Sequence, residues 1–177
     1  MVEHAFTLFD TPIGRCGIAW SPHGIVMLQL PEARETETRA RLLRRLPDAR
    51  PETPPAQVQR AIDGVRALLR GEPSKLHTVE LDMDRVPPFH KRVYEAARRI
   101  PPGSTLSYGA VAVRAGAPGA ARAVGQALGK NPFAIIVPCH RVLAAGGKVG
   151  GFSANGGTNT KLRLLELERP AQLEANR

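Results

Sequence analysis

Cysteines are scarce in this sequence, and long apolar runs are absent. The 177 residues include two cysteines, Cys16 and Cys139, which lie far apart and lack the spacing of metal ligands. The sequence therefore argues against a disulfide scaffold and against a zinc finger. The first six residues lack the basic start and apolar core of a signal peptide, and no segment approaches the roughly 18 apolar residues of a membrane span. We expect a cytoplasmic protein with no membrane partner.

Acidic residues are outnumbered by basic ones. There are 25 lysines and arginines against 16 aspartates and glutamates, which gives a net charge of +9 and a pI near 10.5. A basic chain of this size favours a polyanionic partner, although many basic proteins are simply soluble. The hydrophobic content of 42% is ordinary for a globular protein and singles out no fold class.

The N-terminal part of the sequence predicts a small antiparallel sheet followed by helices. Apolar segments of strand length flank a turn at residues 10–14, and a third follows Gly24. We expect a meander of three strands at residues 6–9, 16–20 and 25–30. The helical spacing of apolar residues then predicts helices at 36–46 and 55–69, joined by a proline-rich surface loop.

A break in the pattern divides the chain into two predicted domains. Residues 79–83 alternate like a strand, and the sequence Val-Pro-Pro at 86–88 then interrupts the chain. We expect an N-terminal α/β domain at residues 1–76, a linker at 77–87 and a C-terminal domain at 88–177.

The C-terminal part is predicted to be mostly helical. Apolar spacing indicates helices at residues 89–100, 108–115 and 120–130. A tight glycine-rich turn at 116–119 joins the last two. Two short helices around such a turn suggest a helix-turn-helix, although this pattern alone is a weak signal.

Cys139 is the candidate nucleophile. A β-branched run at residues 135–137 predicts a buried strand, and Pro138, which ends it, has a φ suited to the first position of a helix. Cys139 would then lie at a helix N-terminus, where the helix dipole favours a thiolate. The alternative is a small buried hydrophobe, the usual environment of a free cysteine. His140 favours the nucleophile, although neighbouring side chains on a helix would need a bridging water to exchange a proton.

The sequence around Cys139 resembles a known family. Residues 131–142, with the core Pro-Cys-His-Arg-Val, resemble the active-site signature of the O6-alkylguanine-DNA alkyltransferases. The resemblance covers residues 89–168, and residues 11–14 give weaker support. Further motifs that carry it lie at residues 107–109, 120–125, 150–153 and 164–168.

This resemblance implies a fold and a function. The fold is α/β, with a small antiparallel N-terminal sheet and helices similar to ribonuclease H, and a mostly helical C-terminal domain with a winged helix-turn-helix. The function is direct-reversal DNA repair, in which an alkyl group moves irreversibly and once per molecule from O6 of guanine to Cys139, with O4 of thymine as a further candidate site. The implied partner is double-stranded DNA that contains O6-alkylguanine. We expect a monomer without a cofactor or a metal.

The family comparison assigns catalytic roles. Cys139 is the alkyl acceptor, His140 acts through water as its base, and Glu168 orients His140. Asn131 braces the active-site turn, although asparagine before proline is also an ordinary turn residue. Glu168 shares a helix face with the leucines three and four positions before it, which predicts a buried carboxylate. The alternative is a frayed, solvated helix end.

The resemblance also implies a pocket for guanine built largely from backbone. The carbonyls of Cys139 and Val142 accept from the guanine amino group, the N–H of Ser153 donates to O6, and the Tyr108 hydroxyl donates to N3. Donation to the base stabilises guanine as the leaving group. Phe152 stands where the family usually has tyrosine, so it can form a wall of the pocket but lacks the hydroxyl.

The predicted helix at 120–130 has a stripe of small residues, Ala121, Gly125 and Gly129. Glycine inside a helix costs about 1 kcal/mol relative to alanine, so the two glycines need a reason. Either another helix packs closely there, or the smooth face enters the minor groove, which is only about 6 Å wide. In the family, the matching Arg122 fills the gap left by a flipped nucleotide, and Tyr108 helps to rotate that nucleotide out. The alternative for Arg122 is a solvated surface charge.

Two other classes of function compete with this interpretation. A damage sensor or DNA-binding regulator could use the same helix-turn-helix, but alkyltransferase-like sensors replace the reactive cysteine, and this chain retains Cys139. A Cys-His hydrolase would release its product with water and turn over, whereas a thioether on Cys139 should not hydrolyse.

Overall fold

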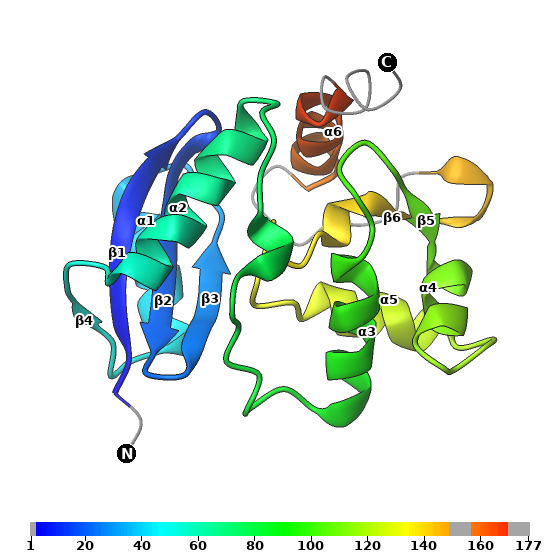
Figure 1. Ribbon diagram of the computed structural model, residues 1–177, viewed down its shortest axis with the longest axis horizontal. Helices are drawn as coiled ribbons and strands as arrows, with labels where there is room; N and C mark the ends of the chain where they lie inside the picture. Colours follow the sequence, from blue (N-terminus) through cyan, green and yellow to red (C-terminus); the bar gives the residue numbers. More distant parts are fainter. Residues whose placement is uncertain (1–2, 149–156, 170–177) are drawn as a thin grey trace. The chain divides into compact units, whose positions relative to one another are not determined.

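The computed structural model describes residues 3–148 and 157–169 (Figure 1). The chain forms two compact units. The first comprises residues 1–84 and 132–136, and the second comprises residues 85–131 and 137–177. The division after residue 84 falls inside the predicted linker, but the short segment 132–136 lies with the first unit, which a boundary drawn along the sequence does not anticipate.

The first unit is built on a four-stranded sheet in the order β3-β2-β1-β4. Three strands form the predicted antiparallel meander, and the fourth is parallel to β1. Their bounds are β1 Ala5–Thr11, β2 Gly14–Ser21, β3 Gly24–Gln29 and β4 Arg50–Pro51. The prediction of three strands was wrong because the proline-rich segment taken as a loop also pairs with the edge of β1. There the N–H of Arg50 donates to the carbonyl of His4 at 3.0 Å.

The predicted strand at residues 79–83 is absent. Only an isolated bridge joins Ile25 to Leu81. Asp82 explains why pairing stops there. Its carboxylate accepts from the hydroxyl of Ser21 at 2.5 Å and from the N–H of Asp84 at 3.0 Å. A short acidic side chain bonded to the backbone two residues later forms a turn, which competes with a strand.

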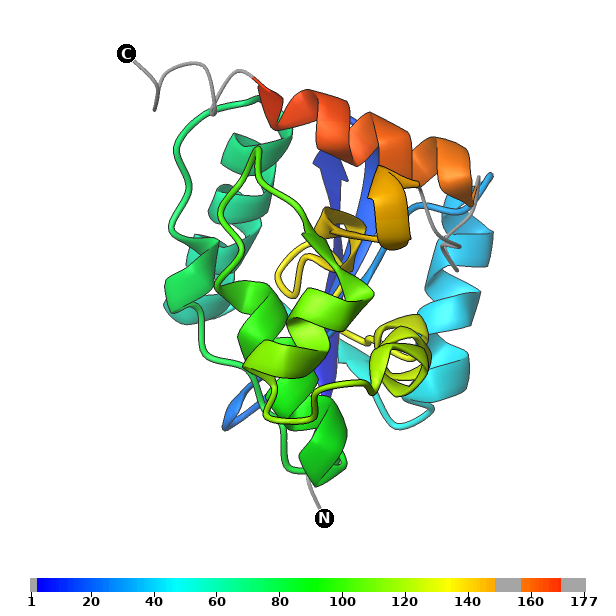
Figure 2. The ribbon, with the colours of Figure 1, turned by 90° about the vertical axis from the view of Figure 1, so that its right-hand side faces the viewer.

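Two helices cover opposite faces of this sheet, α1 (Glu35–Arg45) and α2 (Ala56–Leu69), and a short 3-10 turn, η1 (Leu76–Thr78), follows them (Figures 1 and 2). Side chains on the two opposite faces of β1 contact the two helices. Phe6 lies beneath the guanidinium of Arg39 in α1, and Phe9 beneath that of Arg66 in α2. The core on the α1 side contains Phe6, Ala19, Met27, Leu42, Leu46 and Ala49.

The second unit is mostly helical, as predicted. Helices α3, α4 and α5 pack on one another, and α5 is seen nearly end-on in Figure 2. A buried hydrogen bond of 2.7 Å from the Tyr94 hydroxyl to the Ala127 carbonyl ties α3 to α5. The hydroxyl of Ser107 caps α4 by accepting from the N–H of Ala110. The bounds are α3 Pro88–Arg98, α4 Tyr108–Arg114, α5 Ala121–Gly129, α6 Thr158–Leu167, β5 Leu106–Ser107 and β6 Val142–Leu143.

The β-branched run at residues 135–137 forms a buried turn and not the predicted strand. Ile135 has a φ of 70°, and the N–H of Ile136 donates to the carbonyl of Ala134 at 2.8 Å. A β-branched residue in this conformation is a genuine outlier and costs about 1–3 kcal/mol. The run matches a strand in composition, but its backbone reverses before a strand can form.

The described helices are all too short or too polar to cross a bilayer.

The packing of the first unit predicts a large effect of one leucine. Leu42 is fully buried in α1, whereas Leu162 in α6 is 46% exposed. We expect Leu42→Ala to lower the free energy of unfolding by about 2–5 kcal/mol, because it leaves a cavity in the core. The matched Leu162→Ala variant should change it by less than about 0.5 kcal/mol. Chemical denaturation of both variants measures this, and equal losses would contradict the assigned core.

Candidate active site

Cys139 begins a single 3-10 turn, η2 (Cys139–Arg141), which Pro138 precedes. The N–H of Arg141 donates to the carbonyl of Pro138 at 2.9 Å and closes the turn. The predicted helix start is therefore present, but it is only three residues long. The Cys139 side chain is buried, with 9% of the residue exposed.

Burial dominates the electrostatics of the thiol. It raises the pKa of Cys139 above its ordinary value, and four weaker effects oppose it. Asn131 hydrogen-bonds the sulfur, the charge of Lys161 attracts the thiolate, and the backbone N–H groups of Cys139 and His140 donate to it. The net result is a protonated thiol in the resting protein, because desolvation of a charged form outweighs these contacts. The thiolate favoured by a helix start is therefore not the resting state.

Asn131 also holds the turn before the cysteine. Its side-chain amide donates to the carbonyl of Val137 at 2.9 Å. The N–H of Cys139 donates to the same carbonyl at 2.8 Å. Asn131 thus contacts both the thiol and the backbone that presents it.

His140 and Glu168 form a buried pair. His140 Nε2 lies 2.6 Å from Glu168 Oε1, and the two residues are 1% and 2% exposed. The alternative of a solvated helix end at Glu168 does not hold. Glu168 lies at the C-cap of α6, one position beyond the last helical residue, where the helix face still turns inward.

Arg141 completes the network and is a residue that the sequence interpretation missed. Its guanidinium donates from Nε to both carboxylate oxygens of Glu168 at 3.0 Å, and from Nη2 to Oε1 at 2.7 Å. The third nitrogen, Nη1, donates to the carbonyl of Ile100 at 2.7 Å. Burial opposes the charge on Glu168, but the hydrogen bonds and charges of His140 and Arg141 hold its pKa at about 2. The carboxylate is therefore ionised.

The imidazole of His140 is neutral at rest. Burial lowers the pKa of His140, the contact with Glu168 raises it, and the positive charges of Arg141 and Lys161 lower it further. Because Nε2 faces an ionised carboxylate, we assign the ring proton to Nε2, which leaves Nδ1 as an acceptor. Nδ1 is buried and has no hydrogen-bond partner among the described residues. The ring can therefore take up one proton at Nδ1.

Lys161 is the second residue that the sequence interpretation missed. It is 1% exposed, and its ammonium donates to the carbonyl of Val142 at 2.7 Å. The same nitrogen lies 5.7 Å from the centre of the Tyr108 ring, close enough for a cation–π contact. A signal was available in the sequence, because Lys161 lies three and seven residues before the buried Leu164 and Glu168 and so shares their helix face.

The residues predicted to meet DNA lie on α5. Arg122 is exposed, and Ala121 is half-buried. A Cβ built on Gly129 meets no atom within 4 Å, and one built on Gly125 meets only the ring of Tyr108 at 3.9 Å. Close packing of another described helix therefore does not explain the glycines.

Phe152 and Ser153, predicted to line the guanine pocket, lie outside the described residues. Tyr108, at the start of α4, and Val142, in β6, are described and share contact with Lys161. Burial raises the pKa of the Tyr108 hydroxyl, and a negative charge at Cys139 raises it further. Its hydroxyl therefore keeps its proton at neutral pH.

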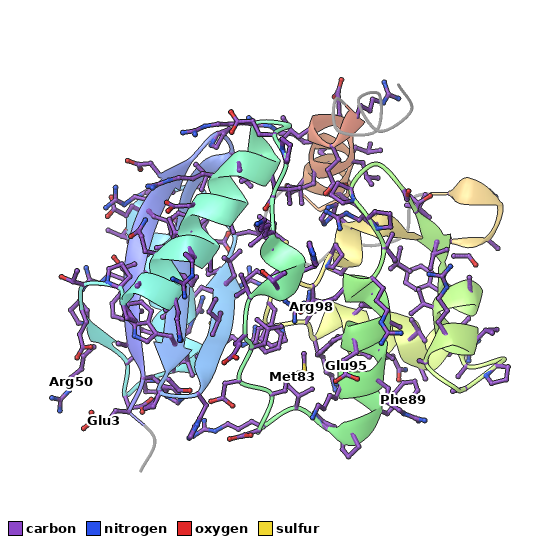
Figure 3. All side chains as sticks on the ribbon, viewed as in Figure 1. Glu3, Arg50, Met83, Phe89, Glu95 and Arg98 are labelled. Carbon is purple, nitrogen blue, oxygen red and sulfur yellow. The ribbon has the colours of Figure 1, made fainter. Side chains whose placement is uncertain are left out.

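The first unit has a hollow of its own, near Glu3 and Arg50, which are labelled in Figure 3. Its lining carries charges of both signs and includes the His4–Asp48 pair at 3.1 Å. Neither cysteine is among its lining residues. This hollow therefore has no thiol nucleophile.

Known proteins share sequence similarity with most of this chain. A family model described as the 6-O-methylguanine DNA methyltransferase DNA-binding domain matches residues 88–170. A methylated-DNA–protein-cysteine methyltransferase of Mycobacterium tuberculosis is 44% identical over 171 residues, which cover 95% of this chain and 96% of the relative. A protein of the same name from Methanothermobacter thermautotrophicus is 32% identical over 157 residues, covering 89% and 81%.

Solved structures agree. The crystal structure of Mycobacterium tuberculosis OGT in complex with DNA superposes with a TM-score of 0.74 at 41% identity, and covers 93% of this chain and 92% of that one. The mixed α/β architecture, with its small and mostly antiparallel sheet, is thus shared with OGT structures. The chain belongs to the methylated-DNA–protein-cysteine methyltransferase family.

Proposed function

We propose that this protein repairs DNA by moving an alkyl group from O6 of guanine to the sulfur of Cys139, once per molecule. The observation that carries the proposal is a buried Cys139 followed directly in the chain by the buried His140–Glu168 pair, in which His140 keeps Nδ1 available as an acceptor. A sulfur–carbon bond forms and the carbon–O6 bond breaks, so the electron pair of that bond passes to guanine. The product is a thioether, which has no route to hydrolysis.

His140 serves as the base in this proposal. A water at Nδ1 carries the Cys139 proton to the ring, and the resulting imidazolium is stabilised by the ionised Glu168 2.6 Å from Nε2. Arg141 holds the carboxylate in position through Nε and its neighbouring nitrogen. Because the pKa of the thiol is raised at rest, sulfur becomes nucleophilic only when this base withdraws its proton.

The substrate is held by backbone and by Tyr108. The carbonyls of Cys139 and Val142 accept from the guanine amino group, Ser153 donates its N–H to O6, and the Tyr108 hydroxyl donates to N3. These donors stabilise the base as it leaves. Phe152 forms one wall of the pocket. The raised pKa of Tyr108 supports its role as a donor, since the hydroxyl stays protonated.

The guanine must leave the duplex to reach the buried thiol, because a buried nucleophile cannot approach O6 inside the base stack. We propose that α5 enters the minor groove with its small face, formed by Ala121, Gly125 and Gly129. Arg122 then occupies the space left by the flipped nucleotide. The open surface at Gly129 and the exposure of Arg122 support this assignment.

The two units have different roles in the proposal. The second unit carries the thiol and a winged helix-turn-helix formed around α4 and α5. The first unit, similar to ribonuclease H, is a scaffold. The working protein is a cytoplasmic monomer whose partner is double-stranded DNA. DNA is also present in the crystal structure of the tuberculosis relative.

A damage sensor and a hydrolase are less well supported. A sensor has no use for a buried thiol with a base and a carboxylate behind it. A hydrolase would form a thioester on Cys139, which water cleaves so that the protein turns over, whereas alkyl transfer leaves a thioether that water does not cleave.

The central test is transfer from DNA. The protein is incubated with duplex DNA bearing O6-methylguanine and digested with a protease. The peptide masses are then measured by mass spectrometry. We expect the Cys139 peptide to gain the mass of one methylene, with at most one group per molecule, and Cys139→Ser to bind the DNA without transfer. Cys16, whose pKa is raised to about 12 by burial, is the internal control and should stay unmodified. Methylation elsewhere, turnover or no transfer would sink the proposal.

The relay predicts a shifted pH profile for Glu168→Gln. Without the carboxylate, protonated His140 is less stable, so the thiol loses its proton only at higher pH. Single-turnover transfer at pH 7 should slow, within the roughly 10²–10⁴-fold that a positioned base contributes, and should recover as the pH rises. DNA affinity and thermal unfolding are measured beside it, because Arg141 loses its partner. Superimposed profiles in a folded variant would limit Glu168 to a structural role.

Base flipping predicts a difference between two substrates. Arg122→Ala should slow repair of duplex DNA far more than it slows reaction with free O6-alkylguanine base, which needs no flipping. Arg44→Ala, which changes an exposed arginine in α1 of the first unit, is the matched control and should affect neither strongly. Equal losses on both substrates would mean that Arg122 supports the pocket instead.

A further inference from the structure

Positive charge is distributed unevenly over the two units. Acidic and basic residues are nearly equal in number in the first unit, so the net charge of +9 is carried by the second. Carboxylates also neutralise arginines in and beside α1 of the first unit. Arg34 lies 3.6 Å from Glu37, and Arg41 pairs with Glu32. A polyanion is therefore attracted to the second unit.

Within the second unit, one face of α3 carries cations that no carboxylate neutralises. Lys91, Arg92 and Arg99 are exposed, and helical spacing places them on the outward side of the helix together with Glu95. None of the three forms an ion pair within the described part of the chain. Arg92 contacts only the ring of Phe89, at 5.6 Å from its centre. Phe89 and Glu95 are labelled in Figure 3.

The recognition helix α5 packs on the other side of α3. The Tyr94 hydroxyl, on the buried side of α3, donates to the Ala127 carbonyl of α5, and helical spacing turns Arg92 away from Tyr94. Arg122 and Gly129 lie on the side of α5 opposite Ala127. Figure 2 shows α5 nearly end-on, to one side of α3. A duplex whose minor groove holds α5 therefore leaves the outward face of α3 open.

We propose that this outward face, formed by Lys91, Arg92, Glu95 and Arg99, binds the phosphate backbone of a second duplex segment while α5 holds the first. The inference rests on the proposed function, which places the lesion-bearing duplex at α5. The match is one of charge. Three unneutralised cations line about 12 Å of helix, and a duplex presents one negative charge per roughly 1.7 Å of its axis. Of the described residues on this face, Glu95 is the only one that opposes a phosphate.

Such a surface recognises the backbone and not the sequence of the second segment. Each phosphate that a cation neutralises contributes about −0.9 to the slope of log affinity against log salt concentration, so three contacts give a slope of about −3. A protein with two DNA-binding faces can contact a new segment before it leaves the old one. The search for a damaged base then proceeds by transfer between segments, without complete release.

The test measures capture of a second duplex. A duplex with one O6-methylguanine is fixed to beads and saturated with the Cys139→Ser protein, which should bind it without transfer. A fluorescent undamaged duplex is then added at several salt concentrations. We expect capture that falls with the slope given above. Combining Lys91→Gln, Arg92→Gln and Arg99→Gln should lower capture at least about tenfold, while the amount of protein on the beads stays the same.

Two control variants separate this surface from general effects of charge and folding. Arg44→Gln combined with Arg45→Gln removes two exposed charges from α1 of the first unit, and should capture as well as the parent protein. Glu95→Gln removes the opposing charge from the outward face of α3, and should increase capture several-fold. An increase of this kind cannot result from loss of fold.

Each other outcome overturns the proposal. Capture that survives the triple substitution would come from association between protein molecules. Loss of protein from the beads would mean that α3 contacts the lesion-bearing duplex itself, or supports the fold. Transfer to Cys139 is measured in parallel with the unsubstituted protein. Transfer without capture would reject the second DNA-binding face and leave the repair function standing, whereas capture without transfer would do the reverse.

Discussion

The second unit depends on one buried carboxylate. Glu168 accepts from His140 and Arg141 at 2.6–3.0 Å, and Arg141 reaches on to the carbonyl of Ile100, beyond the end of α3. Three segments far apart in the sequence thus meet at one charge. Burying a carboxylate with only one partner would cost free energy. Here the permanently charged Arg141 compensates the charge of Glu168, and the titratable His140 ring also bonds to it. This arrangement leaves His140 neutral and able to accept a proton.

Much of this arrangement could be predicted from the sequence. The helical spacing around Leu164 indicates the buried side of α6, and the motif around Cys139 identifies the thiol and its neighbouring base. The contacts of Arg141 and Lys161 could not be predicted in the same way, because they join residues 19 to 41 positions apart. A charged side chain on an apolar helix face indicates that a charged or polar group pairs with it in the folded protein, but it does not identify that partner.

The errors in the fold share a physical origin. Residues 135–137 and 79–83 have strand-like composition, yet one reverses at Ile135 and the other turns at Asp82. Composition reports how well side chains suit a buried or pleated environment, whereas pairing requires a neighbouring edge with free backbone groups. The two-residue β4 shows the converse, since an edge of β1 was available to a segment without strand character.

The strained backbone at Ile135 costs some folding stability but restricts the conformation of the turn. Glycine would adopt the φ of 70° at little cost, but it would also permit many other conformations. An isoleucine whose side chain is 2% exposed can leave this conformation only by removing that side chain from the core. The backbone four residues before the sulfur is therefore restricted to a narrow range. The segment that leads to Cys139 therefore has few alternative backbone conformations before any substrate binds.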